Sequence, residues 1–545
     1  MSPRTTIRAA SWLAVVALLT GCLTQNPPAG PSATDPATAA ASSTSSAGSA
    51  TDAPSPTPTA PATFPLAVVT GLTNLKPSIT LAELRQLAER GELVMPCGVQ
   101  VERPALGPAG SCRPADAIAP FLESRQQRVA LLPPGLVEPA TKVLRIAGSG
   151  PFGLFGPDLF GDPRARARPY PVIGSPTPDA QLDPAWTAYD PSQIWTLTNL
   201  GSLCSDRWAA YEAVTNGKGW DWVFNGGTAR YAGPAVVDPP DPPPFGAQVP
   251  VNPIDAGNGG ATPAIVRRSD VAIADHECPV VPSATWQPRG ISDPANVFSV
   301  PSDVLTHWRD TLGLDVIYLA ANHMSDQGAG GIRSTLELLD QFGFPRTGLG
   351  MNLRQALEPA YVEVAGLRIA FVAFNDVPGV APAGRSTPGV AWLTRPNVQR
   401  GVRQARAGGA DLVICNPQWW GGAEYHDDIW PVQVEQLGWF DEAGCDHVIG
   451  SGTHVAGPLL IRQRGDGPSV VLVSPGNYVF GQGWWQETQE GVILDLAFRG
   501  TSLVNVRLHP TVQILQARPA LLDPEGDGRY VLQRIWKYAQ IDSTR

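Results

Sequence analysis

The stretch "DVIYLAANHMSDQGAGGIRSTLELLDQFGF", residues 315–344, joins an apolar run of β-forming residues to a segment with helical spacing. Its first part predicts a buried strand over 315–320. Its second part predicts a helix over 329–342, because apolar side chains recur on one face at Ile332, Leu336 and Leu339. A strand that leads directly into a helix is the repeating unit of parallel α/β folds.

This alternation recurs from residue 194 onward and predicts a largely parallel sheet with its sites at the strand carboxyl ends. Three later apolar segments, "YVF", "GVILDLAF" and "SLVNVRL", predict a second, more antiparallel sheet. The Pro/Gly-rich segment 231–265 is expected to be a surface loop. Strands are predicted at 194–199, 270–275, 315–320, 361–374, 411–415, 446–450 and 469–473, and helices near 302–312, 329–342, 395–408 and 431–443.

Polar residues follow five of these strands. The segments are "GSLCSDR" (201–207), "DHECP" (275–279), "ANHMSDQG" (321–328), "NPQWWGGAEYHD" (416–427) and "GSGTHVAGP" (450–458). In order, spacing and flanking words they resemble the CapA family of poly-γ-glutamate capsule proteins, which belongs among the calcineurin-like metallophosphatases. The opening stretch and "SPGNYVFGQ" (474–482) match the pattern of that family too, and the resemblance covers about residues 194–508.

The resemblance implies an α/β fold: a two-sheet metallophosphatase-like sandwich flanked by helices, with divalent metal bound where the sheets converge. Carried over by position, it implies that metal ligands are Glu277, Asn322, His323 and His454. It implies a catalytic role for His323 and for Asp326, which would orient that imidazole. Glu424 matches the acid of the fourth segment.

Three positions depart from the family pattern. Ser202 stands where an acid is usual, Gln418 where a His is usual, and Gly452 replaces the first of two His. Asp206 and His426 lie close enough in sequence to compensate. The expected cofactor is therefore at most one tightly held divalent ion, of unknown identity.

Each of these residues also has a structural alternative. A His at a strand end can simply be a hydrogen-bonding group, and Glu424 or Asp326 can be a helix cap or a solvated loop acid. The pairs Trp419-Trp420 and Trp484-Trp485 can stack on sugar rings, although aromatic core packing is the commoner role.

The first 22 residues predict a lipoprotein signal peptide. Arg4 and Arg8 precede a short apolar run, and "LTGC" ends at Cys22 as a lipobox. The alternative is an ordinary cleaved signal with a coincidental Cys. Residues 23–62 are almost wholly Pro, Ala, Ser, Thr, Gly and Asp, which predicts a disordered tether. The expected location is extracytoplasmic, with the chain anchored to a bacterial cell membrane by its lipid.

Residues 63–190 predict a small accessory α/β domain. Its helix "TLAELR" (80–85) and its strand pair "ALLP" (130–133) and "VLRI" (143–146) resemble fragments of periplasmic binding-protein domains. The CapA-like domain is expected over 191–510, and 511–545 is expected to be a C-terminal extension.

The formal net charge of −10 argues against nucleic acid as a partner. Six Cys remain after Cys22, an even number that is compatible with disulfides in an oxidising compartment. Cys97 with Cys112 is the best candidate pair, and Cys204 and Cys278 follow strands that are expected to be close in space.

Two functional hypotheses remain. The first is a surface-anchored, metal-dependent hydrolase or transferase of the metallophosphatase type that acts on an anionic cell-envelope polymer, and Glu277, Asn322, His323 and His454 favour it. The second is a non-catalytic envelope binding protein with a decayed metal site, and Ser202, Gln418 and Gly452 favour it.

Overall fold

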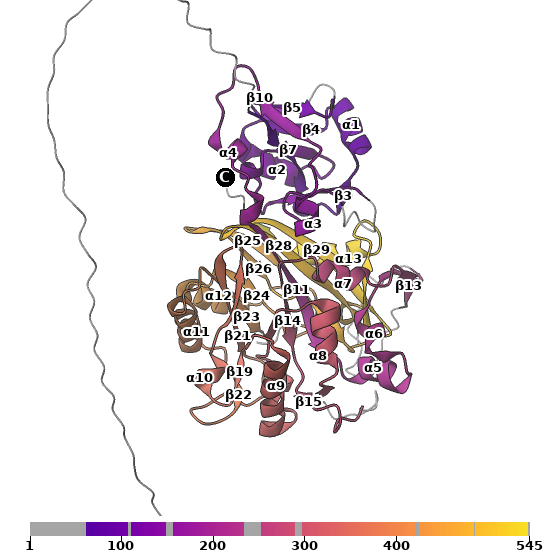
Figure 1. Ribbon diagram of the computed structural model, residues 1–545, viewed down its shortest axis with the longest axis vertical. Coiled ribbons are helices and arrows are strands. Elements are labelled where there is room, and N and C mark those ends of the chain that lie inside the picture. Colours follow the sequence, from indigo (N-terminus) through magenta and orange to yellow (C-terminus); the bar gives the residue numbers. More distant parts are fainter. Residues whose placement is uncertain are drawn as a thin grey trace, which may run out of the picture. The chain divides into compact units, whose positions relative to one another are not determined.

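The structure is a computed structural model that describes residues 62–106, 111–148, 156–233, 252–288, 297–419, 424–483 and 485–542 (Figure 1). These ranges fall within one compact unit, Ala60–Arg545. Cys22 and residues 23–61 of the predicted tether lie outside the described residues. Within the described part, every helix is too short or too polar to cross a membrane.

The larger of the two main sheets is mixed. The strands β11 (Ile194–Cys204), β14 (Val271–His276), β17 (Val316–Tyr318) and β18 (Arg346–Thr347) pair in parallel up to one edge of the sheet, whereas β28 (Glu490–Arg499) pairs antiparallel with β11. The separate antiparallel sheet predicted from the last apolar segments is therefore wrong, because those segments extend the parallel strands. The order is β13 (Pro253–Gly257), β12 (Thr228–Tyr231), β30 (Arg518–Leu522), β29 (Ser502–Ile514), β28 (Glu490–Arg499), β11 (Ile194–Cys204), β14 (Val271–His276), β17 (Val316–Tyr318) and β18 (Arg346–Thr347), with β27 (Asn477–Phe480) paired to β11.

The second main sheet has seven strands. The single strand predicted at 361–374 is a hairpin, because Ala365 and Gly366 both have positive φ angles and turn the chain between β20 and β21. The order is β20 (Ala360–Val364), β21 (Leu367–Asn375), β23 (Leu412–Gln418), β24 (His447–Ile449), β26 (Gly467–Leu472), β25 (Leu459–Arg464) and β31 (Gln540–Ile541).

The two sheets share one apolar core, which confirms the predicted sandwich. Trp195 and Ile273 of the larger sheet belong to the same buried cluster as Phe371 and Ile414 of the smaller one. Helix α9 (Gly328–Phe342) buries its apolar face on the larger sheet, and α11 (Arg395–Ala407) and α12 (Pro431–Ala443) bury theirs on the smaller one. In Figure 1, α11 and α12 lie beside β23 and β24.

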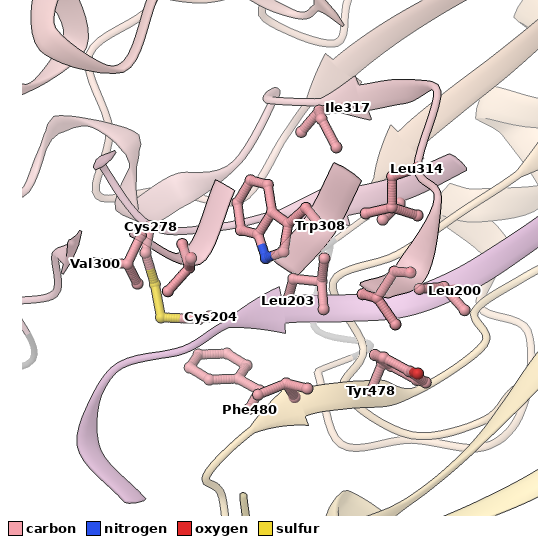
Figure 2. Packing of buried hydrophobic residues seen from close by; sticks show 14 of the residues in the cluster. Leu200, Leu203, Cys204, Cys278, Val300, Trp308, Leu314, Ile317, Tyr478 and Phe480 are labelled. Atoms are coloured by element: carbon pink, nitrogen blue, oxygen red, sulfur yellow. A yellow bond between two sulfur atoms is a disulfide. The ribbon is translucent and has the colours of Figure 1, made fainter. Parts of the chain in front are cut away.

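Beneath the strand-end loops of the larger sheet, Trp308 is fully buried among Leu203, Leu314 and Ile317 (Figure 2). A disulfide between Cys204 and Cys278 joins the last residue of β11 to the segment that follows β14. It ties together two of the loops that carry predicted site residues. The Cys97–Cys112 pair is also confirmed, and a third disulfide joins Cys415 to Cys445.

Residues 64–176 form smaller sheets, and their buried cluster also includes Ile194, Ala497 and Val504 of the larger main sheet. The predicted helix is α1 (Leu81–Glu89), which begins with a capping box between Thr80 and Glu83. The predicted strands are β7 (Val129–Leu132) and β8 (Thr141–Val143). The backbone N–H of Val143 donates to the Asn505 side chain at 2.9 Å, so this region is hydrogen-bonded to β29.

The domain boundary expected at 510 and the loop expected over 231–265 both differ from the structure. The boundary at 510 falls inside β29, and the predicted C-terminal extension contributes β30 to one main sheet and β31 to the other. The helix α13 (Gly528–Lys537) also packs on this core. Within the predicted loop 231–265, the helix α7 (Ala261–Val266) is largely buried.

Candidate functional site

The predicted site residues lie where the parallel strands end. Ser202 is near the end of β11, Glu277 directly follows β14, and Gln418 is the last residue of β23. Asn322 and His323 begin a short 3₁₀ turn after β17. Parallel strands deliver these loops to one edge, which is why residues far apart in sequence meet there.

Glu277 and His454 lie opposite each other. The Nε2 atom of His454 is 4.0 Å from Oε2 of Glu277, and both side chains are buried. Neither carboxylate oxygen of Glu277 has a hydrogen-bond partner among the described residues. A buried carboxylate without a donor is costly, so this position fits a bound cation.

Asn477 fixes the protonation pattern of His454. Its amide nitrogen donates to the Thr488 carbonyl at 2.9 Å and to Gln482 Oε1 at 3.0 Å, so its Oδ1 is an acceptor toward His454 Nδ1 at 3.0 Å. The Nδ1 atom must therefore carry a proton, so Nε2 is the nitrogen that faces Glu277. In the neutral ring two acceptors face one another, and a cation between them would satisfy both.

Asn322 is paired with Gln418 rather than left open. The Oε1 atom of Gln418 accepts the backbone N–H of Asn322 at 2.9 Å, and its Nε2 donates to Asn322 Oδ1 at 3.2 Å. Gln418 is fully buried and forms a backbone bridge to Ser451. Gln418, which replaces the family's His, thus donates a hydrogen bond to Asn322 Oδ1, the oxygen that the resemblance assigns to the metal.

His323 and Asp326 form a second pair. The Nδ1 of His323 lies 2.9 Å from Asp326 Oδ2, which also accepts the backbone N–H of Phe298 at 2.7 Å. A carboxylate can only accept here, so Nδ1 carries the proton and Nε2 keeps its lone pair. Asp206 holds the next residue by accepting the N–H of Ser299 at 2.9 Å. Asp206 therefore fixes this loop and does not replace a missing ligand.

Phe298 separates His323 from a cation. Its ring meets the edge of the His323 imidazole at a centroid distance of 4.4 Å, and the Arg207 guanidinium lies over the same ring at 4.4 Å. Arg207 is half-buried and follows Asp206 directly. A positive group is thereby held one ring away from His323.

Ser202 is bonded within the sheet. Its hydroxyl donates to Asp275 Oδ2 at 3.3 Å, and both residues are buried. Burial, together with the negative charge of Glu277, raises the pKa of Asp275 well above its ordinary value. A neutral hydroxyl committed to Asp275 is a poor substitute for the family's acid.

Gly452 cannot be exchanged for the family's His in this backbone. Its φ angle is +91°, and a Cβ atom would meet the Trp419 carbonyl oxygen at 2.7 Å. Both facts exclude an ordinary side chain without a shift of the main chain. This ligand position is closed by geometry and not only by residue type.

The remaining candidates lie on the loop after β23. Glu424 is half-buried, and His426 is exposed with its ring 4.9 Å from that of Trp430. Tyr425, which sequence reasoning missed, stacks on His454 at a centroid distance of 5.7 Å. Of the tryptophan pairs, Trp419 is a buried core residue, and Trp420 and Trp484 lie outside the described residues.

Asn477 and Phe298 were also missed. Asn477 stands in the motif "SPGNYVFGQ", whose match to the family pattern was a usable signal. Phe298 carries no such signal, because an apolar residue in an irregular loop gives no indication that it supports a histidine.

The structure brings two of the predicted metal ligands, Glu277 and His454, face to face. Glu277 and His454 supply two facing donors, but Gln418 occupies Asn322, Ser202 is neutral, and Gly452 has no side chain. Among the described residues, no group of three or more His, Cys, Asp or Glu side chains is arranged to hold a metal. The remaining ligands of a single ion would be water or substrate oxygens.

Residues 254–482 match the family model described as bacterial capsule synthesis protein PGA_cap. This region is thus similar to that family. The PGA_cap region contains Glu277, Asn322, His323, Gln418, His454 and Asn477, so the resemblance stated from the strand-end segments is confirmed.

Two curated relatives match part of the chain. The capsule biosynthesis protein CapA of Bacillus anthracis is 30% identical over 201 residues, which are 36% of this chain and 47% of that protein. The PGA biosynthesis protein CapA of Bacillus subtilis (strain 168) is 28% identical over 211 residues, 38% of this chain and 53% of that protein. The chain thus spans about half the length of the curated relatives it matches.

Solved structures give only distant likenesses. The match to the NAD nucleotidase NadN of Haemophilus influenzae covers 64% of this chain and 57% of that one, with 11% identity and a TM-score of 0.32. The match to a 5'-nucleotidase precursor of Thermus thermophilus covers 63% and 58%, with 13% identity and a TM-score of 0.31. The fold assignment therefore rests on the two sheets and their shared core.

Proposed function

We propose that this protein acts outside the cytoplasm on an anionic cell-envelope polymer, in the biosynthesis or processing of a capsule such as poly-γ-glutamate, through a reduced metallophosphatase-type site. The observation that carries the proposal is the buried, donor-free Glu277 facing His454 inside the PGA_cap region, within the part of the chain that the structure describes. The names of the Bacillus relatives supply the class of polymer.

Glu277 and His454 would hold the single divalent ion, and Asn477 would keep the imidazole in the tautomer that a metal ligand requires. Such an ion supplies Lewis-acid polarisation of a phosphoryl or carbonyl oxygen and a more acidic bound water. His323, held by Asp326, would accept or donate a proton at Nε2. The role of Asp326 is to fix the ring and to stabilise its protonated form.

Arg207 would attract the negative charges of the polymer. Its guanidinium lies over the Phe298 ring, which also contacts the His323 imidazole. The chain as a whole is acidic, with a formal net charge of −10, and a polyanion therefore needs a local cation at the point of binding. Arg207 and the bound ion would provide that charge.

A second candidate is a non-catalytic binding protein of the same envelope polymer. The pairing of Gln418 with Asn322 and the closed position at Gly452 favour it, because both remove ligands that a two-metal hydrolase uses. In this case the protein binds the polymer at the same strand-end site but does not cleave or transfer it.

The test uses the full-length chain, poly-γ-glutamate and a p-nitrophenyl phosphodiester, with dextran as a neutral control polymer. Saturable binding of poly-γ-glutamate, with bond cleavage that needs added divalent metal and is lost in Glu277→Gln, would support the hydrolase. Binding without cleavage of either compound under any metal would select the non-catalytic candidate. Equal affinity for dextran, or no binding at all, would overturn both.

Arg207→Ala tests the recognition step. It should weaken poly-γ-glutamate binding about tenfold and reduce its salt dependence, as expected for one lost charge contact. Arg354→Ala is the matched control, because Arg354 is exposed and pairs with Glu358 on its own surface. An Arg207→Ala protein that binds like the control would show that Arg207 does not recognise the polymer.

A further inference from the structure

A pocket lies away from the strand-end site, between residues 72–77, strands β8 and β29, and helix α13. Its apolar lining includes Leu75, Leu508, Leu532 and Trp536. Its polar lining is positively charged, because it contains Lys142, Arg145 and Arg507 but, among the described residues that line it, neither Asp nor Glu.

The acids behind the pocket do not balance these cations. Asp158 forms ion pairs with two arginines. Its Oδ2 atom lies 3.3 Å from Arg145 Nε and 2.7 Å from Arg507 Nη2, and all three side chains are buried. The Lys142 ammonium donates to a neutral partner, the backbone carbonyl of Asn74. The two buried arginines thus share one acid, which leaves an excess of positive charge in the wall of the pocket, and Glu123 and Glu525 lie near enough to the half-buried Lys142 to raise its pKa.

The next layer is balanced. Asp495 pairs with Arg268 and with His509, the latter at 2.8 Å, and burial lowers the pKa of His509 to about 4, so this ring adds no charge near neutral pH. Burial and then the charges of Arg268 and Arg507 lower the pKa of Arg145. Burial and then Arg507 lower the pKa of Lys142 to about 7. The pKa values of Arg145 and Lys142 are thus lowered for the same two reasons. Burial removes each cation from water, and neighbouring positive charges repel it.

The cavity, which is partly open to solvent, measures about 40 Å³. A buried water needs about 10–15 Å³ in this measure, so the space has room for roughly three waters or one compact polyatomic anion. The surplus charge and the size together select a small group with several acceptor oxygens.

We propose that this pocket is a binding site for a small oxyanion, a sulfate, phosphate or carboxylate group, held by Lys142, Arg145 and Arg507. The anion would join residues of the N-terminal region to β29, since Lys142 and Arg145 come from one side and Arg507 from the other. The anion site is separate from the strand-end site. Thr196 and Thr198, on the first half of β11, line a smaller pocket that shares Arg145 and Arg507 with the anion site. Ser202, by contrast, lies near the other end of that strand.

The test is direct titration of the full-length chain with sodium sulfate, inorganic phosphate and sodium acetate, against sodium chloride at equal ionic strength. Sulfate or phosphate should bind once per chain and raise the melting temperature in a saturable way. Acetate binding at similar affinity would assign the site to carboxylates, whereas preference for sulfate and phosphate would assign it to tetrahedral anions. Effects no larger than those of chloride would overturn the proposal.

Lys142→Met should weaken sulfate binding about fivefold or more, and Lys142→Arg should retain it, because the charge is kept. Lys537→Met is the matched control. Lys537 is exposed on the same helix as Trp536 and does not line the pocket, so this substitution removes one charge away from the site. Equal sulfate affinity in Lys142→Met and Lys537→Met would refute the role of Lys142. Selenate soaked into crystals should give an anomalous peak between Lys142 and Arg507, and a peak elsewhere would also refute the site.

Discussion

The Nε2 atom of His454 faces the Oε2 atom of Glu277 across 4.0 Å, with no described hydrogen-bond donor to either Glu277 oxygen. Asn477 turns the protonated nitrogen of His454 away from this gap. With a neutral ring the pair is an acceptor facing an acceptor, an arrangement that costs free energy unless a cation, either a metal ion or a proton on Nε2, occupies it. This relationship survives although three other expected ligand positions hold Ser202, Gln418 and Gly452.

The first prediction is one divalent ion per chain. Titration with Mn²⁺ or Zn²⁺, followed by metal analysis, should give a stoichiometry near one. Asn477→Ala should weaken metal affinity about 10–100-fold, because it releases the His454 ring. Glu277→Gln should weaken it further, and Glu358→Gln, an exposed acid, should leave it unchanged. Two tightly bound ions would contradict the closed position at Gly452.

The second prediction separates His323 from Asp326. His323→Ala should abolish hydrolysis and change the free energy of unfolding by less than about 1 kcal/mol, since the imidazole lies at a partly exposed turn. Asp326→Ala should lose the hydrogen bond to the Phe298 N–H as well, at a cost of about 1–3 kcal/mol. Denaturant unfolding and a phosphodiester assay measure the two effects. Equal loss of stability in both variants would show that His323 is structural.

The third prediction concerns acid stability. Burial, followed by Arg464 and Arg462, lowers the pKa of His447 to about 3, and its Nδ1 accepts the Val470 N–H at 3.2 Å. The unfolded chain binds a proton at this His below its ordinary pKa of about 6.5, whereas the folded chain does not. The stabilising contribution is therefore complete above about pH 6.5 and is lost as pH falls toward about 3.

In that window, His447→Asn should reduce the slope of unfolding free energy against pH by up to about 1.4 kcal/mol per pH unit. Asn keeps an acceptor for Val470, so the fold should persist. His426→Asn is the control, because His426 is exposed and should leave the slope unchanged. Parallel pH profiles for wild type and His447→Asn would refute the assignment.

The fourth prediction is that removal of residues 1–62 leaves a cooperatively folding protein. The compact unit begins at Ala60, and Phe64 is the first residue of its buried core. Thermal unfolding of the truncated and full-length chains should give melting temperatures within about 2 °C. A broad, non-cooperative transition in the truncated chain would show that the removed segment contributes to the fold.

The fifth prediction is lipidation at Cys22. The motif "LTGC" after a basic and apolar leader motivates it. Cys22→Ser, expressed in a bacterium that processes lipoproteins, should move the protein from the detergent phase to the aqueous phase and remove the lipid mass. Unchanged partitioning and mass would exclude a lipid on this residue.

Much of the fold could be predicted from sequence periodicity. Helices α9, α11 and α12 begin and end within a residue of the expected positions, because their apolar spacing and termini are local signals. The assignment of β28 and β29 to a separate sheet failed for a physical reason. A strand's own pattern shows that it has buried faces, but not which neighbour it pairs with.

The sequence by itself determined the succession of strands and helices and the residue types at the strand ends, since both are encoded within short segments. Only the tertiary structure decided what those residues can do. Gln418 occupies the Asn322 side chain, Asn477 directs the lone pair of His454 toward Glu277, and Trp419 closes the space beside Gly452. Each relationship depends on strand register and backbone angle across distant segments, and a linear pattern carries neither quantity.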